Sequence, residues 1–230
     1  VNQLADVTDE ISYMSPDIIV FQEMTAAGNI QMDAHPSMVD YSHVINGATS
    51  LQIAIYFNDN FVEKVGSASV LSTFTKTQGR YPIVQKFRNK FTLNEFVVIG
   101  VHFDSTLDAT GESNRADTVT DLISYVETNY SGQRVIIAGD MNTMLSQARW
   151  SGGTSELASF ITAGYKTDNS DDSLSENQSY LPSNLRLDHM FFKNFNFTGN
   201  KSLHNKMLER DASFETTTSD HVPVYSSVVV

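Results

Sequence analysis

Seven residues of this sequence have side chains that could hold a metal ion, move a proton or donate to an anion, and each lies next to an apolar segment. They are Glu23 after "IIVFQ", His102 after "VVIGV", Asp140 and Asn142 in "RVIIAGDMNTM", Asp188 in "LRLDHMFF", and Asp220 with His221 in "SDHVPVY". Carboxylates bind hard divalent cations, imidazoles transfer protons near neutral pH, and an amide donates where negative charge develops. The set indicates hydrolytic, metal-assisted chemistry.

Taken singly, each residue has an ordinary structural explanation. A glutamate after a strand is usually a cap or a solvated charge, a buried histidine is usually satisfied in the core, and Asp-x-Asn is common in turns. Together, four carboxylates, two imidazoles and an amide are an excess of polar groups unless they share a ligand, because buried charges must be paired or bound to metal. Asp140 and Asn142 are also two residues apart, on one side of an extended chain.

The elements that must position these residues alternate between helix and strand patterns. Apolar residues at helical spacing predict helices over 4–14, 112–130 and 154–165. Short apolar or period-2 segments predict strands at 18–23, 51–57, 81–87, 96–103, 134–140, 185–192 and 222–230. Open α/β sheets place their sites at the carboxyl ends of strands. We therefore predict a single mixed α/β domain over residues 1–230.

Composition excludes several classes of protein. The 230 residues are 40% hydrophobic and contain no cysteine, so disulfides and thiolate metal sites are absent. A net charge of −12 argues against a broad basic surface for nucleic acid, although a carboxylate-bound cation could still bring a phosphate to the site. Every apolar run is far shorter than the roughly 18 residues of a membrane span. We expect no stable membrane association. The compartment stays open, with a secreted bacterial protein favoured over a cytoplasmic one.

Taken in order, these segments resemble the endonuclease/exonuclease/phosphatase superfamily, which has the DNase I-like fold. The resemblance runs from "SPDIIVFQEM" through "GRYPIVQKF", "FVVIGVHFDS", "VIIAGDMNT" and "LRLDHMFF" to "TSDHVPVYSSVVV", nearly the whole chain. Arg80 in "GRYPIVQKF" looks like the Arg-x-Pro stretch of DNase I-type nucleases. The implied architecture is a two-layer β-sandwich of mixed sheets flanked by helices (α/β/β/α), with a phosphodiesterase site across the sheet tops.

The resemblance also implies a role for each site residue. Glu23 would hold Mg²⁺, with Mn²⁺ or Ca²⁺ as alternatives, and Asp220 would add metal affinity. Asp140 would orient the attacking water while the Asn142 amide donates to the phosphate. Asp188 would orient the imidazole of His221. His102 would act as a donor or acid, and Arg80 would contact the phosphate. The implied protein is a monomeric nuclease that hydrolyses DNA with little sequence preference.

The sequence departs from the family in three places, one of which is that the groove-reading arginine shortly after the metal glutamate of DNase I is absent, since Thr25 follows in "QEMTAAG". Family members begin with a strand that carries an asparagine metal ligand, whereas here residues 4–14 before Glu23 have a helical pattern. We therefore expect that the first strand is absent from this chain. An acidic partner for the imidazole of His102 is also missing, since the strand at 51–57 offers Gln52 at best.

Two other functions remain open on the same scaffold: a sphingomyelinase-like or inositol-phosphate hydrolase, and a catalytically inactive binding module. An exposed apolar hairpin of the kind sphingomyelinases carry is not evident, which favours nucleic acid. Several further residues are predicted to be structural. We expect Asp104 to start a loop, His189 and Trp150 to pack, and His35, His43 and His204 to lie at the surface.

Overall fold

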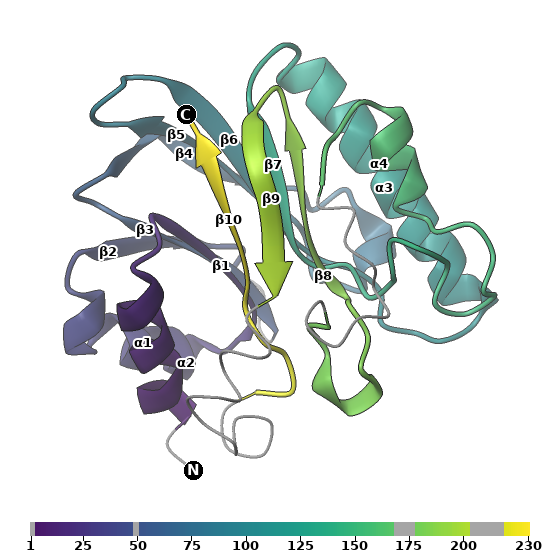
Figure 1. Ribbon diagram of the computed structural model, residues 1–230, viewed down its shortest axis with the longest axis horizontal. Coiled ribbons are helices and arrows are strands. Elements are labelled where there is room, and N and C mark those ends of the chain that lie inside the picture. The colour runs from purple at the N-terminus through teal and green to yellow at the C-terminus, as the bar shows by residue number, and fades with distance from the viewer. Residues whose placement is uncertain (1–2, 48–50, 168–177, 203–218) are drawn as a thin grey trace.

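The computed structural model describes residues 3–47, 51–167, 178–202 and 219–230, in which helices and strands alternate along the chain (Figure 1). The helices are α1 (Gln3–Met14), α2 (Ala26–Asp33), α3 (Ala109–Asn129) and α4 (Ala158–Thr162), with short 3-10 turns at Pro36–Met38, Thr75–Thr77 and Leu181–Ser183. The strands are β1 (Ile18–Met24), β2 (Tyr41–Ile45), β3 (Gln52–Asn58), β4 (Val62–Val70), β5 (Ile83–Asn89), β6 (Glu95–His102), β7 (Val135–Asp140), β8 (Asp188–Lys193), β9 (Asn196–Ser202) and β10 (Val224–Val229).

A five-stranded sheet in the order β4-β5-β6-β7-β8 forms the centre of the molecule. Only β6 and β7 run parallel, and α3 connects them as a crossover helix. The apolar residues of β6 alternate between two cores, because successive side chains of a strand point to opposite faces. Val97, Ile99 and Val101 pack under α3 and α4, whereas Phe96 and Val98 face the second layer.

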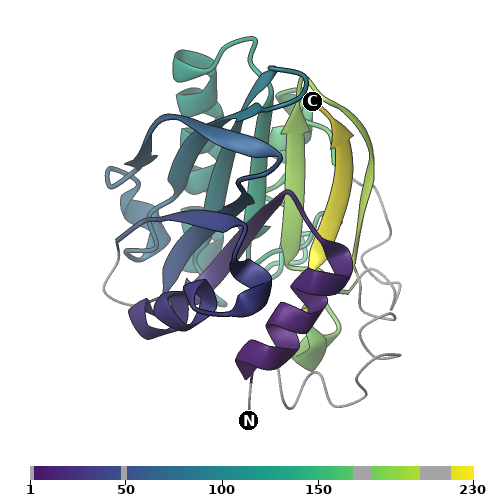
Figure 2. The ribbon, with the colours of Figure 1, turned by 90° about the vertical axis from the view of Figure 1, so that its left-hand side faces the viewer.

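The second layer is a three-stranded antiparallel sheet in the order β1-β3-β2. All of β3 is buried, because its inner face packs on the central sheet and its outer face lies under α1 and α2. Figure 2 shows α1 and α2 below this sheet, with β9 and β10 beside it. The antiparallel pair β9 and β10 packs against the same inter-sheet core through Val228. The sandwich flanked by helices is thus confirmed.

Several element predictions differ from the structure. We missed β2, β4, β9 and α2, and the last predicted helix shortens to α4. The sequence of β4, "VEKVGSASV", gives little apolar alternation because β4 is an edge strand with mostly exposed side chains. The strand predicted at 185–192 begins only at Asp188. None of the helices in the described ranges is long and apolar enough to cross a membrane.

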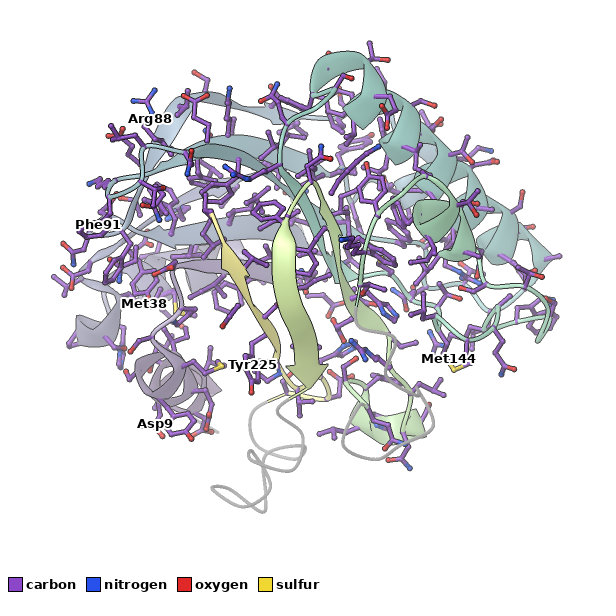
Figure 3. The ribbon with its side chains drawn as sticks, turned by 45° about the horizontal axis from the view of Figure 1, so that its top comes forward. Asp9, Met38, Arg88, Phe91, Met144 and Tyr225 are labelled. Carbon is purple, nitrogen blue, oxygen red and sulfur yellow. The ribbon has the colours of Figure 1, made fainter. Side chains whose placement is uncertain are left out.

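The predicted absence of an exposed apolar stretch is wrong at one end of the sandwich. Phe61, Phe91 and Leu93 are 40%, 73% and 68% exposed, and the two phenylalanine rings lie 6.0 Å apart. Phe91 follows β5, whereas the candidate site lies at the other end of β6. In Figure 3, Phe91 and Arg88 lie on the opposite side of the molecule from Met144, which follows β7. These apolar side chains are therefore remote from the site.

Candidate active site

Three of the predicted site residues form a row across the central sheet. His102 of β6 pairs in register with Asp140 of β7, and Asp140 pairs with Asp188 of β8. Residues in register on adjacent strands point to the same face, about 5 Å apart. The Nε2 atom of His102 lies 3.5 Å from Oδ2 of Asp140. The strand-end residues that the sequence scatters over 87 positions (102 to 188) therefore meet in one place.

The backbone around Asp140 is shaped by its neighbours. Gly139 has φ +144°, and a Cβ there would lie 2.1 Å from the carbonyl oxygen of Val101, so only glycine fits. Asn142 takes the left-handed conformation (φ +51°), which folds its N–H back 2.8 Å from Oδ1 of Asp140. Its Nδ2 donates to Oδ2 of Asp140 at 2.9 Å. Burial, with the charge of Asp188, raises the pKa of Asp140 to about 7.

His221 reaches this row from the end of the chain. Its Nδ1 lies 2.6 Å from Oδ2 of Asp188, and its ring packs at 4.9 Å from the ring of Tyr180. The hydroxyl of Ser179 accepts from the backbone N–H of Asp188 and so fixes the start of β8. Burial disfavours the charged imidazole, but the carboxylates of Asp188, Asp140 and Asp220 together raise the pKa of His221 to about 9. The imidazole is therefore protonated at neutral pH.

Arg80 lies against His102. Its Nη1 donates to Nε2 of His102 at 2.7 Å and to the carbonyl oxygen of Phe103 at 3.0 Å. Because Nε2 accepts this bond, the ring proton lies on Nδ1, a buried atom with no partner among the described residues. Burial and the charge of Arg80 lower the pKa of His102 to about 3. The expected donor or acid, His102, is thus a neutral acceptor in this arrangement.

Gln52 is the residue that the sequence offers at best as a partner for His102. In the structure its Oε1 accepts from Nδ2 of Asn29 at 2.7 Å.

Glu23 approaches the row from the other sheet. It sits in a bulge at the end of β1 with φ +57°, which turns its side chain so that Oε1 lies 3.8 Å from Nε2 of His102. The side chain is 64% exposed. A free carboxylate at the mouth of a site suits a hard cation such as Mg²⁺, which binds through one or two carboxylates together with water and substrate phosphate.

Asp220 is less well placed than we predicted. Its side chain is exposed, and its backbone carbonyl accepts from the N–H of Leu181. Among the residues that the structure describes, no three His, Cys, Asp or Glu side chains form a metal cluster. The donor set therefore fits a cation held largely by Glu23, water and substrate, and it does not form an all-protein cage.

Two residues of the site, Arg149 and Tyr180, are not predicted from the sequence. Arg149, from the loop after β7, donates through Nη1 to Oδ1 of Asn142 at 3.1 Å. The Cζ atom of Arg149 lies 5.7 Å from the ring centre of Tyr180, which also contacts His221. Both residues lie in loops without a recognisable motif. The only signal in the sequence is that Arg149 is a cation seven residues after Asn142, in a strongly acidic chain.

The remaining predicted residues divide between confirmed and corrected. Asp104 starts the loop after β6, is 1% exposed and accepts from Gln78, Thr106 and Asn114. His189 is buried, as expected, and its Nε2 lies 2.9 Å from the carbonyl oxygen of Thr143.

The prediction that Trp150 packs in the interior is wrong, because its side chain is 53% exposed beside the first turns of α3. His43 is also more than a surface residue. It lies on β2, stacks on Tyr56 at 4.8 Å and pairs with Asp33. His35 is half-buried, and His204 lies outside the described residues.

One protein family matches the sequence, and many solved structures share its fold. A family model described as "Endonuclease/Exonuclease/phosphatase family" matches residues 1–221. D. rerio TDP2 humanized by 14 mutations gives a TM-score of 0.75 at 15% identity, over 100% of this chain and 94% of that one.

Two further solved structures are similar. A mannosyl-6-phosphatase of Bacteroides thetaiotaomicron gives a TM-score of 0.74 at 17% identity, over 99% of this chain and 91% of that one. The human Nocturnin catalytic domain with bound sulfate gives 0.72 at 14% identity, over 99% and 86%. No curated protein matches the sequence. Identities this low show a shared fold alone.

Proposed function

This chain belongs to the endonuclease/exonuclease/phosphatase family, whose members are hydrolases acting on phosphoester bonds, and we propose that it is a divalent-metal-dependent phosphodiesterase that hydrolyses DNA. The observation that carries this proposal is the convergence of side chains from both sheets. His102, Asp140 and Asp188 lie in register in one row. Nδ1 of His221 lies 2.6 Å from Oδ2 of Asp188, and Oε1 of Glu23 lies 3.8 Å from Nε2 of His102.

Asp140 is suited to activate the attacking water. Its pKa near 7 makes it an effective general base at neutral pH, since both protonation states are then accessible. Both its oxygens accept hydrogen bonds from Asn142, which fix the orientation of the carboxylate. The water would meet the part of the Asp140 side chain that stays exposed, which is 10%.

His221 is suited to stabilise negative charge on the phosphoryl group. Asp188 accepts from Nδ1 and holds the ring, so the proton on Nε2 is the one free to donate. Because the pKa of His221 is raised to about 9, the imidazole carries its proton throughout the neutral range. A positively charged donor in a partly buried site stabilises a developing oxyanion strongly.

Arg80 is the expected phosphate contact on the other side of Asp140. Its Nη1 donates to His102 and to Phe103, and its Nη2 donates to Gln78 and Ser105, both at 3.1 Å. A phosphate would therefore bind to the Nε–H and take over one of the Nη bonds. When a phosphate takes over Nη1, Nε2 of His102 loses its donor. His102 can then shift its proton to Nε2 and donate to the substrate in the neutral state.

Glu23 is the residue best placed to hold Mg²⁺, or Mn²⁺ or Ca²⁺, with Asp220 contributing at longer range. The bound cation would supply Lewis-acid neutralisation of the scissile phosphate, in addition to the positive charges of Arg80 and His221, in a chain of net charge −12. A DNA substrate is supported by the nuclease-like Arg80 motif. In addition, D. rerio TDP2, whose fold this chain shares at 14% identity, has been solved with a single-strand DNA product.

The test is a panel of substrates incubated with the protein, which we propose is a monomer, in Mg²⁺, Mn²⁺, Ca²⁺ or EDTA. The panel contains supercoiled plasmid, sphingomyelin and inositol phosphates. We expect metal-dependent nicking of the plasmid that His221→Ala slows strongly. His35→Ala, which changes a histidine outside the site, should leave the nicking intact. Turnover of sphingomyelin or inositol phosphates alone would move the substrate to those classes. Turnover of nothing would favour a binding module.

A further inference from the structure

The amide of Asn142 has no donor left for a substrate. Its Nδ2 donates to Oδ2 of Asp140 at 2.9 Å and to the carbonyl oxygen of Phe103 at 3.2 Å, which engages both N–H groups. Its Oδ1 accepts from Nη1 of Arg149 at 3.1 Å. Two partners fix which end of the amide is oxygen, because the guanidinium of Arg149 only donates and the carbonyl oxygen of Phe103 only accepts. Asn142 therefore holds Asp140 and Arg149 together and does not itself point an N–H at a phosphate.

Arg149 is held in place from three sides. Its backbone N–H donates to Oγ1 of Thr143 at 3.3 Å, its Nη1 to Asn142, and one face of its guanidinium lies on the ring of Tyr180 with Cζ 5.7 Å from the centre. A guanidinium has five N–H donors. Only the bond to Asn142 uses one of them within the described ranges, so the others are available to a ligand.

A short chain of contacts joins Arg149 to Arg80. Nη1 of Arg80 and Nδ2 of Asn142 both donate to the carbonyl oxygen of Phe103, and Arg149 donates to the other end of the Asn142 amide. Asp140 lies beside this chain, bonded to Asn142. The two guanidinium groups thus flank the residue that we expect to orient the nucleophile.

We propose that Arg149 is a second phosphate-binding residue, which takes the donor role expected of Asn142 and grips the substrate phosphate from the side opposite Arg80. This inference rests on the proposed function, since it concerns the same site. The ligand is a phosphate group with two unesterified oxygens, one for each guanidinium. Partial burial of Arg149 strengthens such a charge-assisted bond, because fewer waters compete for the donor.

Tyr180 has a distinct part in this arrangement. Its ring contacts Arg149 at 5.7 Å and His221 at 4.9 Å, so one aromatic side chain spaces the two cations that would face the phosphate. The backbone of Tyr180 also pairs with that of His221. Tyr180 is a positioning residue: Tyr180→Leu removes the ring face on which Arg149 lies and should weaken phosphate binding in the same direction as Arg149→Met.

The competing explanation is that Arg149 only fixes the orientation of Asn142. In that case its loss would disturb Asp140 and lower kcat, but the affinity for free phosphate would not change. If Arg149 binds phosphate, the dissociation constant of inorganic phosphate and the KM for substrate should both rise. Phosphate binding separates the two explanations without any turnover.

The experiment measures binding of inorganic phosphate by calorimetry, and hydrolysis of bis(p-nitrophenyl) phosphate, for wild type, Arg149→Met, Arg149→Lys and Tyr180→Leu. Arg134→Gln, which also removes one positive charge but lies before β7 at the far end of the sheet, is the matched control. We expect the phosphate affinity to fall about 10- to 100-fold in Arg149→Met and less in Arg149→Lys, and to be unchanged in the control.

Two results would overturn the inference: wild type that binds no phosphate in the millimolar range, and Arg149→Met that retains wild-type phosphate affinity while kcat falls. Thermal unfolding of each variant reports on folding. If Arg149→Met does not fold, the affinity of Arg149→Lys decides in its place. A wild-type protein that binds phosphate through Arg149 but hydrolyses no phosphoester would refute the proposed activity and leave this inference standing.

Discussion

The Nδ1 atom of His221 lies 2.6 Å from Oδ2 of Asp188, although the two residues are 33 positions apart in the chain. Asp188→Asn replaces the accepting carboxylate by an amide that can donate to Nδ1, so the ring loses both its orientation and its charge. We expect kcat/KM for the phosphodiester to fall about 10²- to 10⁴-fold, and about as much in His221→Ala. Steady-state kinetics at pH 7 check this. Wild-type activity in Asp188→Asn would remove the pair from the mechanism.

Glu23→Gln should separate metal binding from folding. The side chain is 64% exposed at the end of β1, so its loss should leave the melting temperature in EDTA unchanged. The Mg²⁺ concentration needed for half-maximal activity should rise about tenfold or more, because an amide is a far weaker ligand than a carboxylate. A Mg²⁺ titration of activity measures the shift. Glu63→Gln, which removes an exposed carboxylate of β4, is the control, and an equal shift in that variant would contradict a specific role for Glu23.

Gly139→Ala should damage both the fold and the site. The new Cβ would lie 2.1 Å from the carbonyl oxygen of Val101, at φ +144°, so β6 and β7 must separate at the point where His102 and Asp140 pair. We expect a loss of about 2 kcal/mol or more in the free energy of unfolding, measured by urea denaturation. At Gly153 a Cβ would meet only the side-chain hydroxyl of Ser151, at 3.1 Å. Gly153→Ala should therefore remain within about 0.5 kcal/mol of wild type.

The buried ion pair of Arg115 and Glu156 holds the loops that carry the site. Nε of Arg115 lies 2.7 Å from Oε1 of Glu156, whose Oε2 accepts from Thr143. Glu156→Leu leaves a buried guanidinium without its partner and should cost about 3–5 kcal/mol of unfolding free energy. The double variant Arg115→Met with Glu156→Leu should recover part of that loss, because two apolar side chains leave no buried charge. Urea denaturation of the three proteins tests both steps, and a double variant less stable than Glu156→Leu would contradict the second.

Asp104 should make stability depend on acid pH. Burial disfavours its charged form, but hydrogen bonds from Thr106 and Asn114 prevail and lower the pKa of Asp104 below 3.8. A carboxylate with a depressed pKa in the folded state stabilises the fold above its unfolded pKa of 3.8, and that contribution is lost as pH falls through the folded value. Asp104→Asn should therefore be less stable than wild type at pH 7, by about 1–3 kcal/mol. Urea denaturation at pH 7 and pH 3 should show the difference shrinking at the lower pH, and a constant difference would sink this explanation.

The sequence alone determined the strongly patterned parts of this protein. The short apolar runs of β1, β3, β5, β6 and β7 indicate strands, and the 21-residue α3 follows from its periodic apolar face. Polar residues directly after those runs indicated where chemistry would lie. Strand β4, by contrast, lacks an apolar pattern because it is an exposed edge, and β2 is too short and evenly half-buried to stand out.

Only the tertiary structure decided which polar groups face one another. Register between β6, β7 and β8 sets His102, Asp140 and Asp188 side by side, and no local pattern encodes register between distant strands. The same folding engages the Asn142 amide with Asp140 and Phe103 and brings Arg149 to its oxygen. Residue types reveal what a side chain can do, but its free donors and its protonation depend on neighbours that long-range packing supplies.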